Sequence, residues 1–303
     1  FALKSLDLGD VRLEAGGRYE HSRVAATADA DLVSPASARR FDALSFSFGA
    51  NYTLLPDWRI GLNLVRSERA PAAEELFARG PHAGTQAFEL GNPGFDKERN
   101  WGVEASLRGQ GTGYGITLNA YYNRFDGYIY DTLVPDAACE AVLPPGGALD
   151  LPCFQYAQAD ARTWGFEAQA NATLAQWNDT RLSLDGQADY VHARVVGVGP
   201  APRIPQLRVM GGVELANSRW TGRVEAEHAF RQDRVTALET ETPRFTLVNA
   251  SLSWRPIADD KATSITLSAD NIFDVVARRH ASLMKDYAPL AGRDIRITAR
   301  FGF

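Results

Sequence analysis

Apolar and polar side chains alternate with a period of two through most of this chain, and no other feature constrains the fold as strongly. Successive side chains of a β-strand point to opposite faces, so such a stretch predicts a strand with one apolar and one polar face. Twelve stretches share the pattern: 11–20, 44–54, 58–64, 101–107, 114–125, 164–174, 181–191, 206–215, 220–230, 245–254, 264–273 and 293–303. Helical periodicity is not convincing anywhere over about ten residues, so the sequence predicts an all-β fold.

The segments between these strands alternate between short and long. The short turns lie at 55–58, 109–113, 175–180, 216–219 and 256–263. The long connections lie at about 23–40, 66–98, 126–162, 192–205, 231–243 and 274–292. In an antiparallel meander this order places every long connection at the same end of the sheet. Barrels of the bacterial outer membrane have this asymmetry, with short periplasmic turns and long extracellular loops.

The tryptophans distinguish a membrane wall from a sheet in water. Five of the six lie beside short turns or at strand starts: Trp58, Trp101, Trp164, Trp220 and Trp254. Aromatic girdles at the two membrane interfaces are typical of transmembrane barrels. A soluble β-sandwich with the apolar face as its core would show the same alternation, but the loop asymmetry favours the membrane. We therefore predict a transmembrane antiparallel β-barrel in the outer membrane, with lipid against its apolar face.

The chain ends within a strand pattern, Ile-Thr-Ala-Arg-Phe-Gly-Phe, in which Phe301 and Phe303 share the apolar side. An open edge strand of this kind would be a template for aggregation in water. We expect the last strand to pair with the first and so to close the barrel. Charged residues on the polar faces are expected to pair with one another or with a plug: Arg12, Arg18, Glu104, Arg108, Glu167, Arg223, Glu225 and Arg296.

Charge and motif content argue against several other classes of protein. The chain carries 32 Lys and Arg against 37 Asp and Glu, a net charge of -5, without blocks of either sign, so we expect no nucleic-acid partner. Its apolar runs are far shorter than the roughly 20 residues of a membrane helix. The sequence shows no nucleophile elbow, phosphate loop or metal-hydrolase helix, so we do not expect an enzyme.

The two cysteines, Cys139 and Cys153, lie in a segment rich in Pro, Gly and Ala. In an oxidising compartment a disulfide between them would close a loop and contribute roughly 3 kcal/mol. Two unpaired thiols are the alternative. These cysteines alone do not make a metal site, because no further His or Cys lies near them to complete the coordination.

Several motifs carry a resemblance to a known family. They include Arg69, Pro71, Glu75 and Leu76 in "RSERAPAAEELF", and Gly91, Asn92, Pro93 and Glu98 in "GNPGFDKE". Further motifs are "YYNRFDGYI", "IPQLR", "ADNIFD" and "APLAGRDIRITARFGF". Through these motifs the chain resembles the TonB-dependent outer-membrane receptors over nearly its whole length. It departs from the family pattern at Phe95, where Leu is usual. The terminal Phe is similar to the signal that the outer-membrane assembly machinery reads.

Within that family, "EELFARGPHAGTQAFELGN" and "ARRHASLMKDYAPLAGR" look most like the zinc-uptake receptors. The resemblance implies a barrel of 22 strands closed by an N-terminal plug that carries the TonB box. About twelve strands are present here, so residues 1–303 are expected to be the C-terminal part of the barrel, with the plug outside this chain. The implied partners are membrane lipid, the TonB complex through the plug, and a metal or metal chelate. We expect no permanently bound cofactor, and a zinc ion or iron complex as the transported species.

His82 is the candidate metal ligand. It follows Glu74 and Glu75 in a glycine-rich loop, and an imidazole with nearby carboxylates suits Zn²⁺. An exposed loop histidine beside incidental acids is the alternative on spacing alone. His280 is a second candidate for binding the transported species, although its neighbours Arg278 and Arg279 disfavour a cation. Those arginines could instead contact an anionic siderophore or a haem propionate.

Two alternatives therefore stay open. The chain could belong to a siderophore or haem receptor of the same family. It could also be a self-contained barrel of twelve strands that acts as an outer-membrane enzyme or an autotransporter translocator, although neither a catalytic Ser with a rim His nor a helical passenger linker is found.

Overall fold

The computed structural model describes residues 1–30, 34–143, 147–237, 239–257 and 262–301. Within these ranges it contains two short helices, α1 (Ala73–Phe77) and α2 (Asp136–Glu140). Neither is long or apolar enough to span a membrane. The strands are β1 (Ala2–Leu8), β2 (Val11–Ala26), β3 (Ser37–Leu55), β4 (Trp58–Arg69), β5 (Arg79–His82), β6 (Ala87–Leu90), β7 (Glu98–Gly111), β8 (Tyr114–Leu133), β9 (Cys153–Trp177), β10 (Thr180–Val195), β11 (Gly199–Pro200), β12 (Arg208–Ala216), β13 (Trp220–Ala229), β14 (Phe245–Trp254), β15 (Ser264–Asp270) and β16 (Asp294–Arg300).

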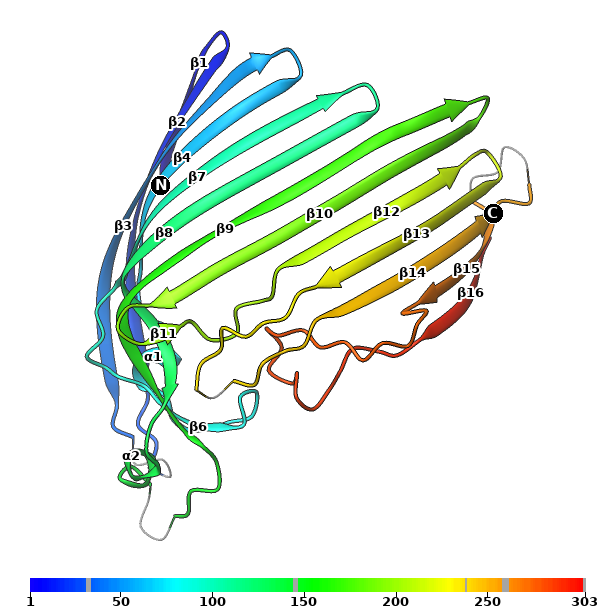
Figure 1. Cartoon of the computed structure of the whole chain (residues 1–303). Coiled ribbons are helices and arrows are strands. Elements are labelled where there is room, and N and C mark those ends of the chain that lie inside the picture. The colour runs from blue at the N-terminus through cyan, green and yellow to red at the C-terminus, as the bar shows by residue number, and fades with distance from the viewer. Residues whose placement is uncertain (31–33, 144–146, 238, 258–261, 302–303) are drawn as a thin grey trace.

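Thirteen of these strands form one curved antiparallel wall in which each strand pairs with its neighbour in the meander (Figure 1). The order is β1-β2-β3-β4-β7-β8-β9-β10-β12-β13-β14-β15-β16. The predicted all-β antiparallel architecture is confirmed, but the predicted number of twelve strands was one too low. The missed strand is β1, in which Leu3 lies on the opposite face from Leu6 and Leu8, so the period-two signal is broken.

The wall is open, and the expected closure between the last and first strands does not occur among the described residues. β16 pairs with β15 and β1 pairs with β2, which leaves two free edges on opposite sides of the sheet (Figure 1). Closing a sheet requires strand number, tilt and register to agree, and thirteen strands with this gentle curvature leave the two edges apart. Phe303, on which the closure argument rested, lies outside the described residues.

The unequal connections are present, with the short turns at one end of the wall and the long connections at the other (Figure 1). β1 and β2 join through a tight turn at Gly9, whose φ of 65° lies in the left-handed region that glycine adopts readily. The turn expected at 256–263 lies partly outside the described residues. The connection predicted at 126–162 is shorter than expected, because β8 continues to Leu133 and β9 begins at Cys153, which leaves 134–152 between them.

Tryptophans mark two levels on the wall. Trp58, Trp220 and Trp254 lie at the short-turn end, where Trp220 and Trp254 stack with ring centroids 5.9 Å apart. Trp101 and Trp164 lie toward the long connections. Trp58 pairs with Gly109, eight positions along β7 from Trp101, which is roughly 26 Å of strand. That spacing matches the roughly 25 Å apolar band of a transmembrane barrel, so the two levels delimit the membrane-spanning part of the wall.

The two faces of the wall differ as the alternation predicts. Leu62 and Val103 are exposed on the apolar face, at 47% and 38%. Charges on the polar face form pairs: Arg12 with Glu14, Arg18 with Glu20, Arg223 with Asp185 and Glu225, and Arg296 with Asp270 and Asp294. The expected pairing within the named set is confirmed for Arg223 with Glu225, whereas Arg12, Arg18 and Arg296 pair with other acids of the wall.

The buried apolar residues gather at the long-connection end, in four clusters. The clusters are Phe41, Leu76, Phe95 and Ile129; Phe88, Leu90, Cys139 and Cys153; Ala161, Ala193, Val195 and Ala201; and Ala229, Phe245 and Ala277. The strands thus form a two-faced wall, and the long connections form a packed cap at one end of it. This cap holds the candidate site.

Candidate functional site

A hairpin formed by β5 and β6 carries the candidate His82 and folds across the wall onto β9. In the hairpin Arg79 pairs with Leu90 and His82 with Ala87. β6 then pairs in parallel with the first residues of β9, with Glu89 opposite Phe154. Sequence alternation gives no sign of this long-range pairing. It brings the predicted metal-binding loop next to the disulfide-bonded connection.

The disulfide predicted between Cys139 and Cys153 is present and supports this hairpin. Both cysteines are buried against Phe88 and Leu90 of β6. The backbone N–H of Phe88 also donates to the carbonyl of Pro152 (3.0 Å). The disulfide therefore packs directly against β6, the strand that carries Glu89.

Glu89, which the sequence analysis missed, is the carboxylate partner of His82. His82 Nδ1 lies 3.3 Å from Glu89 Oε1 and 3.1 Å from the hydroxyl of Thr85. The Thr85 hydroxyl donates to Glu89 Oε1 (2.6 Å), and the Tyr156 hydroxyl donates to Glu89 Oε2 (3.3 Å). The imidazole is 56% exposed and the carboxylate 7%. An accessible nitrogen thus stands over a carboxylate that two hydroxyl groups hold in place.

The environment of Tyr156 shows that the surroundings of Glu89 are shielded from solvent. It lies on β9 eight positions before the Trp164 level, outside the membrane-spanning part of the wall. Burial, and then the charge of Glu89, raise the pKa of the Tyr156 phenol. The phenol therefore stays protonated and keeps donating to Glu89 at neutral pH.

Glu75, expected beside His82, instead holds the local backbone together. Its two carboxylate oxygens accept from the Arg69 guanidinium at 2.8 and 3.0 Å, and one also accepts the N–H of Ala72 (2.7 Å). Arg69 reaches Glu98 as well (3.3 Å). The Glu74 side chain is exposed. Among the described contacts neither acid reaches His82, because α1 uses Glu75 at its own first turn.

The motifs on either side of the hairpin meet in space. Gly91 donates its N–H to the carbonyl of Ala78 (2.7 Å), and Asn92 donates to Glu75 (2.9 Å). A Cβ on Gly91 would lie 2.5 Å from the backbone of Leu76, so only glycine allows this approach. The two ends of the segment are therefore tied together and the hairpin projects from a fixed base.

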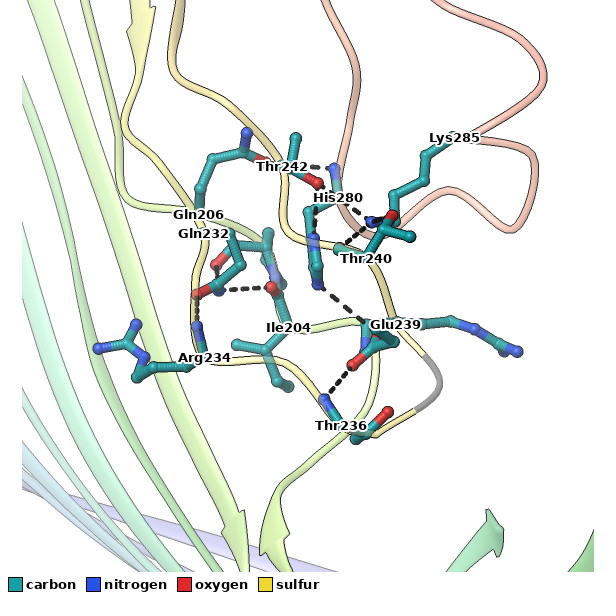
Figure 2. Close-up of polar contacts among 12 residues, drawn as sticks. Ile204, Gln206, Gln232, Arg234, Thr236, Glu239, Thr240, Thr242, His280 and Lys285 are labelled. Atoms are coloured by element: carbon teal, nitrogen blue, oxygen red, sulfur yellow. Dashed lines mark hydrogen bonds and ion pairs between the residues drawn. The ribbon is translucent and has the colours of Figure 1, made fainter. Parts of the chain in front are cut away.

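His280, the second candidate, is fully buried between two long connections (Figure 2). Its Nδ1 lies 2.8 Å from the Thr242 hydroxyl, and its backbone N–H donates to Gln206 Oε1 (3.2 Å). Its Nε2 lies 3.5 Å from Glu239 Oε1. Burial, and then the nearby Lys285 ammonium, lower the pKa of the imidazole, so His280 is neutral at pH 7.

The two arginines beside His280 are engaged within the protein. Arg279 makes a bidentate ion pair with Glu227 and lies over the ring of Phe245, 5.4 Å from its centroid. Arg278 donates to the backbone carbonyl of Lys285. Arg279 therefore holds the 274–292 connection against β13, and Arg278 holds two parts of the same connection together. Their predicted role toward an anionic ligand would require these contacts to break.

A cavity of about 520 Å³ lies between these elements. Thr85 lines it on the side of the hairpin, and Glu239, His280 and Lys285 line it on the other side. The structure thus brings His82 and His280, which are far apart in the chain, to the same end of the wall. No group of three or more His, Cys, Asp or Glu side chains suited to a metal occurs among the described residues. His82 and His280 each lie beside one carboxylate, Glu89 and Glu239 respectively.

Sequence reasoning missed Glu89, Tyr156 and Glu239. Glu89 carried a usable signal, because it is the single charged residue in the apolar stretch Ala87–Leu90, and a buried acid requires a partner. Tyr156 and Glu239 carried no such signal. Tyr156 continues a strand pattern, and Glu239 lies in a polar connection.

The chain matches a family model described as TonB dependent receptor-like, beta-barrel, over residues 1–272. Its fold is similar to that of the copper transporter OprC, with a TM-score of 0.79, 15% sequence identity, and 95% of this chain aligned to 44% of the other. It is also similar to the FrpB iron transporter from Neisseria meningitidis, F3-3 variant (TM-score 0.69, 12% identity, 97% of this chain and 42% of the other), and to the ferric citrate transporter FecA in the unliganded form (TM-score 0.69, 17% identity, 96% and 42%). The chain spans less than half the length of each of these structures.

Proposed function

The chain belongs to the TonB-dependent receptor-like β-barrel family of the bacterial outer membrane, and from this premise we propose that it forms the C-terminal part of a receptor barrel that takes up zinc. The open edges of β1 and β16 support the proposal that more strands complete the wall. A plug inside the completed barrel would contact the TonB complex. The family and the solved structures with this fold are receptors and transporters, which leaves the enzyme alternative without support.

One observation carries the choice of cargo, the geometry of His82 over Glu89. A tetrahedral Zn²⁺ with ligand bonds of about 2.1 Å separates a nitrogen and an oxygen ligand by about 3.4 Å. The observed distance between His82 Nδ1 and Glu89 Oε1 is 3.3 Å. The pair therefore offers two ligand atoms at the required spacing, on a loop that faces the long-connection end.

The pair is suited to capture and release. His82 is exposed and can receive an ion from solvent, while Glu89 is fixed by Thr85 and Tyr156. Two ligands leave the remaining positions of the ion open, and we propose that the plug supplies them. A site shared between barrel and plug would weaken when the plug moves, which is what uptake requires.

Zinc titration of the full-length protein in detergent tests this proposal. His82→Ala should weaken zinc binding, because it removes one ligand and leaves the barrel intact. His21→Ala is the matched control, since His21 is also exposed and also faces a carboxylate, Asp42, but at the hydrogen-bonding distance of 2.8 Å. Equal zinc affinity in wild type and His82→Ala would refute the proposal.

An iron-chelate receptor is the second candidate, because the chain also resembles an iron transporter, FrpB, and a ferric citrate transporter, FecA. The contacts of Arg279 with Glu227 and of Arg278 with a backbone carbonyl count against those two residues as chelate ligands. If the titration shows tight binding of a ferric chelate and none of zinc, this second candidate replaces the first.

A further inference from the structure

His280 is a buried side chain in which one ring nitrogen, Nε2, makes no hydrogen bond among the described residues. The side chain has no exposed surface. The ring lines the 520 Å³ cavity, and Figure 2 shows its Nε2 end directed at Glu239, which lines the same cavity. Buried polar atoms in native proteins are nearly always satisfied, so an orphaned nitrogen at a cavity wall points to a missing partner.

Hydrogen bonding at the other ring nitrogen is consistent with a metal ligand. The Lys285 ammonium donates to the Thr242 hydroxyl oxygen (3.3 Å), and the same oxygen can accept Nδ1–H of a neutral His280 (2.8 Å). In that tautomer Nε2 presents a lone pair toward the Glu239 carboxylate. Two acceptors would then face each other, and a cation between them would stabilise both. Metal-binding histidines commonly donate their second N–H in this way.

The distance between His280 Nε2 and Glu239 Oε1 also fits two ligands of one metal ion. Nε2 of His280 lies 3.5 Å from Glu239 Oε1, against about 3.4 Å for two ligands of a tetrahedral Zn²⁺. Glu239 is held for this role by neutral donors, since the N–H groups of Arg203 (2.5 Å) and Thr236 (3.0 Å) donate to its two oxygens. We propose that His280 and Glu239 form a second binding station for a divalent cation inside this cavity.

Lys285 is the charge that opposes such an ion. Its ammonium group lies on the Nδ1 side of the ring, where it donates to the carbonyl and hydroxyl of Thr240 and approaches Asp286 Oδ1 to 3.9 Å. Asp286 therefore offsets the lysine charge, and Glu239 faces the ring from the Nε2 side. The arrangement reverses the sequence-based expectation for His280, because Arg278 and Arg279 are turned away to other partners.

The second station extends the proposed function, on which it rests for the identity of the cargo. Thr85, which contacts both His82 and Glu89, lines the cavity that His280 and Glu239 line from the opposite side. The buried pair therefore lines the cavity directly, whereas the exposed pair adjoins it through Thr85. An ion captured at His82 would have a second imidazole and carboxylate to move to.

Calorimetric titration of the metal-free, full-length protein with zinc chloride tests this inference. Glu239→Gln and His280→Gln should each remove one bound ion or weaken one site by at least about tenfold, which is the lower bound for disturbing even an outer contact of a metal site. Glu241→Gln is the control in the same connection, because Glu241 is exposed and pairs with Arg231. Thermal unfolding of each variant checks that the cap remains folded.

The possible outcomes separate the two proposals. If His82→Ala removes an ion and both Glu239→Gln and His280→Gln bind as wild type does, the second station is wrong and the proposed function stands. If Glu239→Gln and His280→Gln each remove an ion and His82→Ala does not, the second station stands and the His82 site is wrong. Unchanged zinc binding in all three variants overturns both.

Discussion

The wall and the cap adjoin along the same strands and yet are stabilised in opposite ways. In the wall, large apolar side chains such as Leu62 are 47% exposed, and the polar face carries paired charges. In the cap, Leu76 is 1% exposed and packs with Phe41, Phe95 and Ile129 from three other segments. The wall therefore relies on lipid to cover its apolar face, whereas the cap has a protein core of its own and can hold side chains in fixed positions.

The largest effect should come from emptying the cap core. Leu76→Ala leaves a cavity in a closed cluster, so the free energy of opening for α1 should fall by about 3 to 5 kcal/mol. Hydrogen exchange of the Leu76 and Phe95 amides measures this opening. Leu62→Ala is the matched control in the wall. Lipid chains refill the space there, so exchange in α1 should stay unchanged, and an equal effect of both variants would remove the distinction between wall and cap.

The wall should be sensitive to charge where the cap is sensitive to volume. Val103→Arg places a guanidinium on the lipid side of β7 and should lower the free energy of unfolding by roughly 2 to 4 kcal/mol near the midplane. Glu104→Gln, one position on, faces the polar side and should change little. Unfolding titrations in bilayers give both values. If the two variants lose the same stability, the assignment of faces is wrong.

Removing the disulfide should loosen one part of the cap only. Replacing Cys139 and Cys153 by serine reopens a loop with a sequence separation of 14 and should lower the opening free energy of β6 by roughly 3 kcal/mol or less. The Phe88 amide, which donates to Pro152, is the reporter. Amides of the wall, such as those of β13, should keep their protection. A uniform loss of protection would show that the cap does not open as a separate unit.

The smallest effect should be a pH dependence at the junction of wall and cap. Glu68 pairs with Arg99, beyond the Trp101 level and outside the membrane-spanning part of the wall. Burial alone would raise its pKa, but hydrogen bonds from Lys97, the Leu44 N–H and Arg66 lower the pKa of Glu68 to about 2. A folded-state pKa below the unfolded value of about 4.3 gives stability that is present above that pH and is lost as pH falls toward 2.

Unfolding titrations at pH 5 and pH 2.5 of wild type and Glu68→Gln measure this contribution. Wild type should lose more stability over that interval than the variant, because the variant has no carboxylate to protonate. Identical pH profiles would show that the junction does not depend on the ionised Glu68.

The wall could be predicted from sequence because its determinants are local. Alternation fixes which side of a strand each residue faces, and short turns fix the order of the strands. β1 was missed because Leu3 breaks the alternation. The far end of β8 was missed because the register shifts between Phe125 and Tyr128, which interrupts the period of two. Closure was predicted wrongly, since period-two patterning carries no information about where an edge finds its partner.

The cap could be predicted only in part, because its contacts join segments that are distant in the chain. The cysteine pair was predicted, since it closes a local loop. The parallel pairing of β6 with β9, which gives His82 the partner Glu89 rather than Glu75, depends on how three connections pack. For the same reason the sequence did not predict that His280 lies buried beside Glu239.

Zinc uptake by living cells is the most direct test of His82 and Glu89 as ligands of the transported ion. Zinc-depleted cells that produce the full-length protein, or its His82→Ala Glu89→Gln double variant, would be compared for the rate of uptake of radioactive zinc, with equal amounts of protein in the outer membrane. We expect uptake through wild type and a fall to the background rate in the double variant. Wild-type rates in the double variant would contradict this expectation.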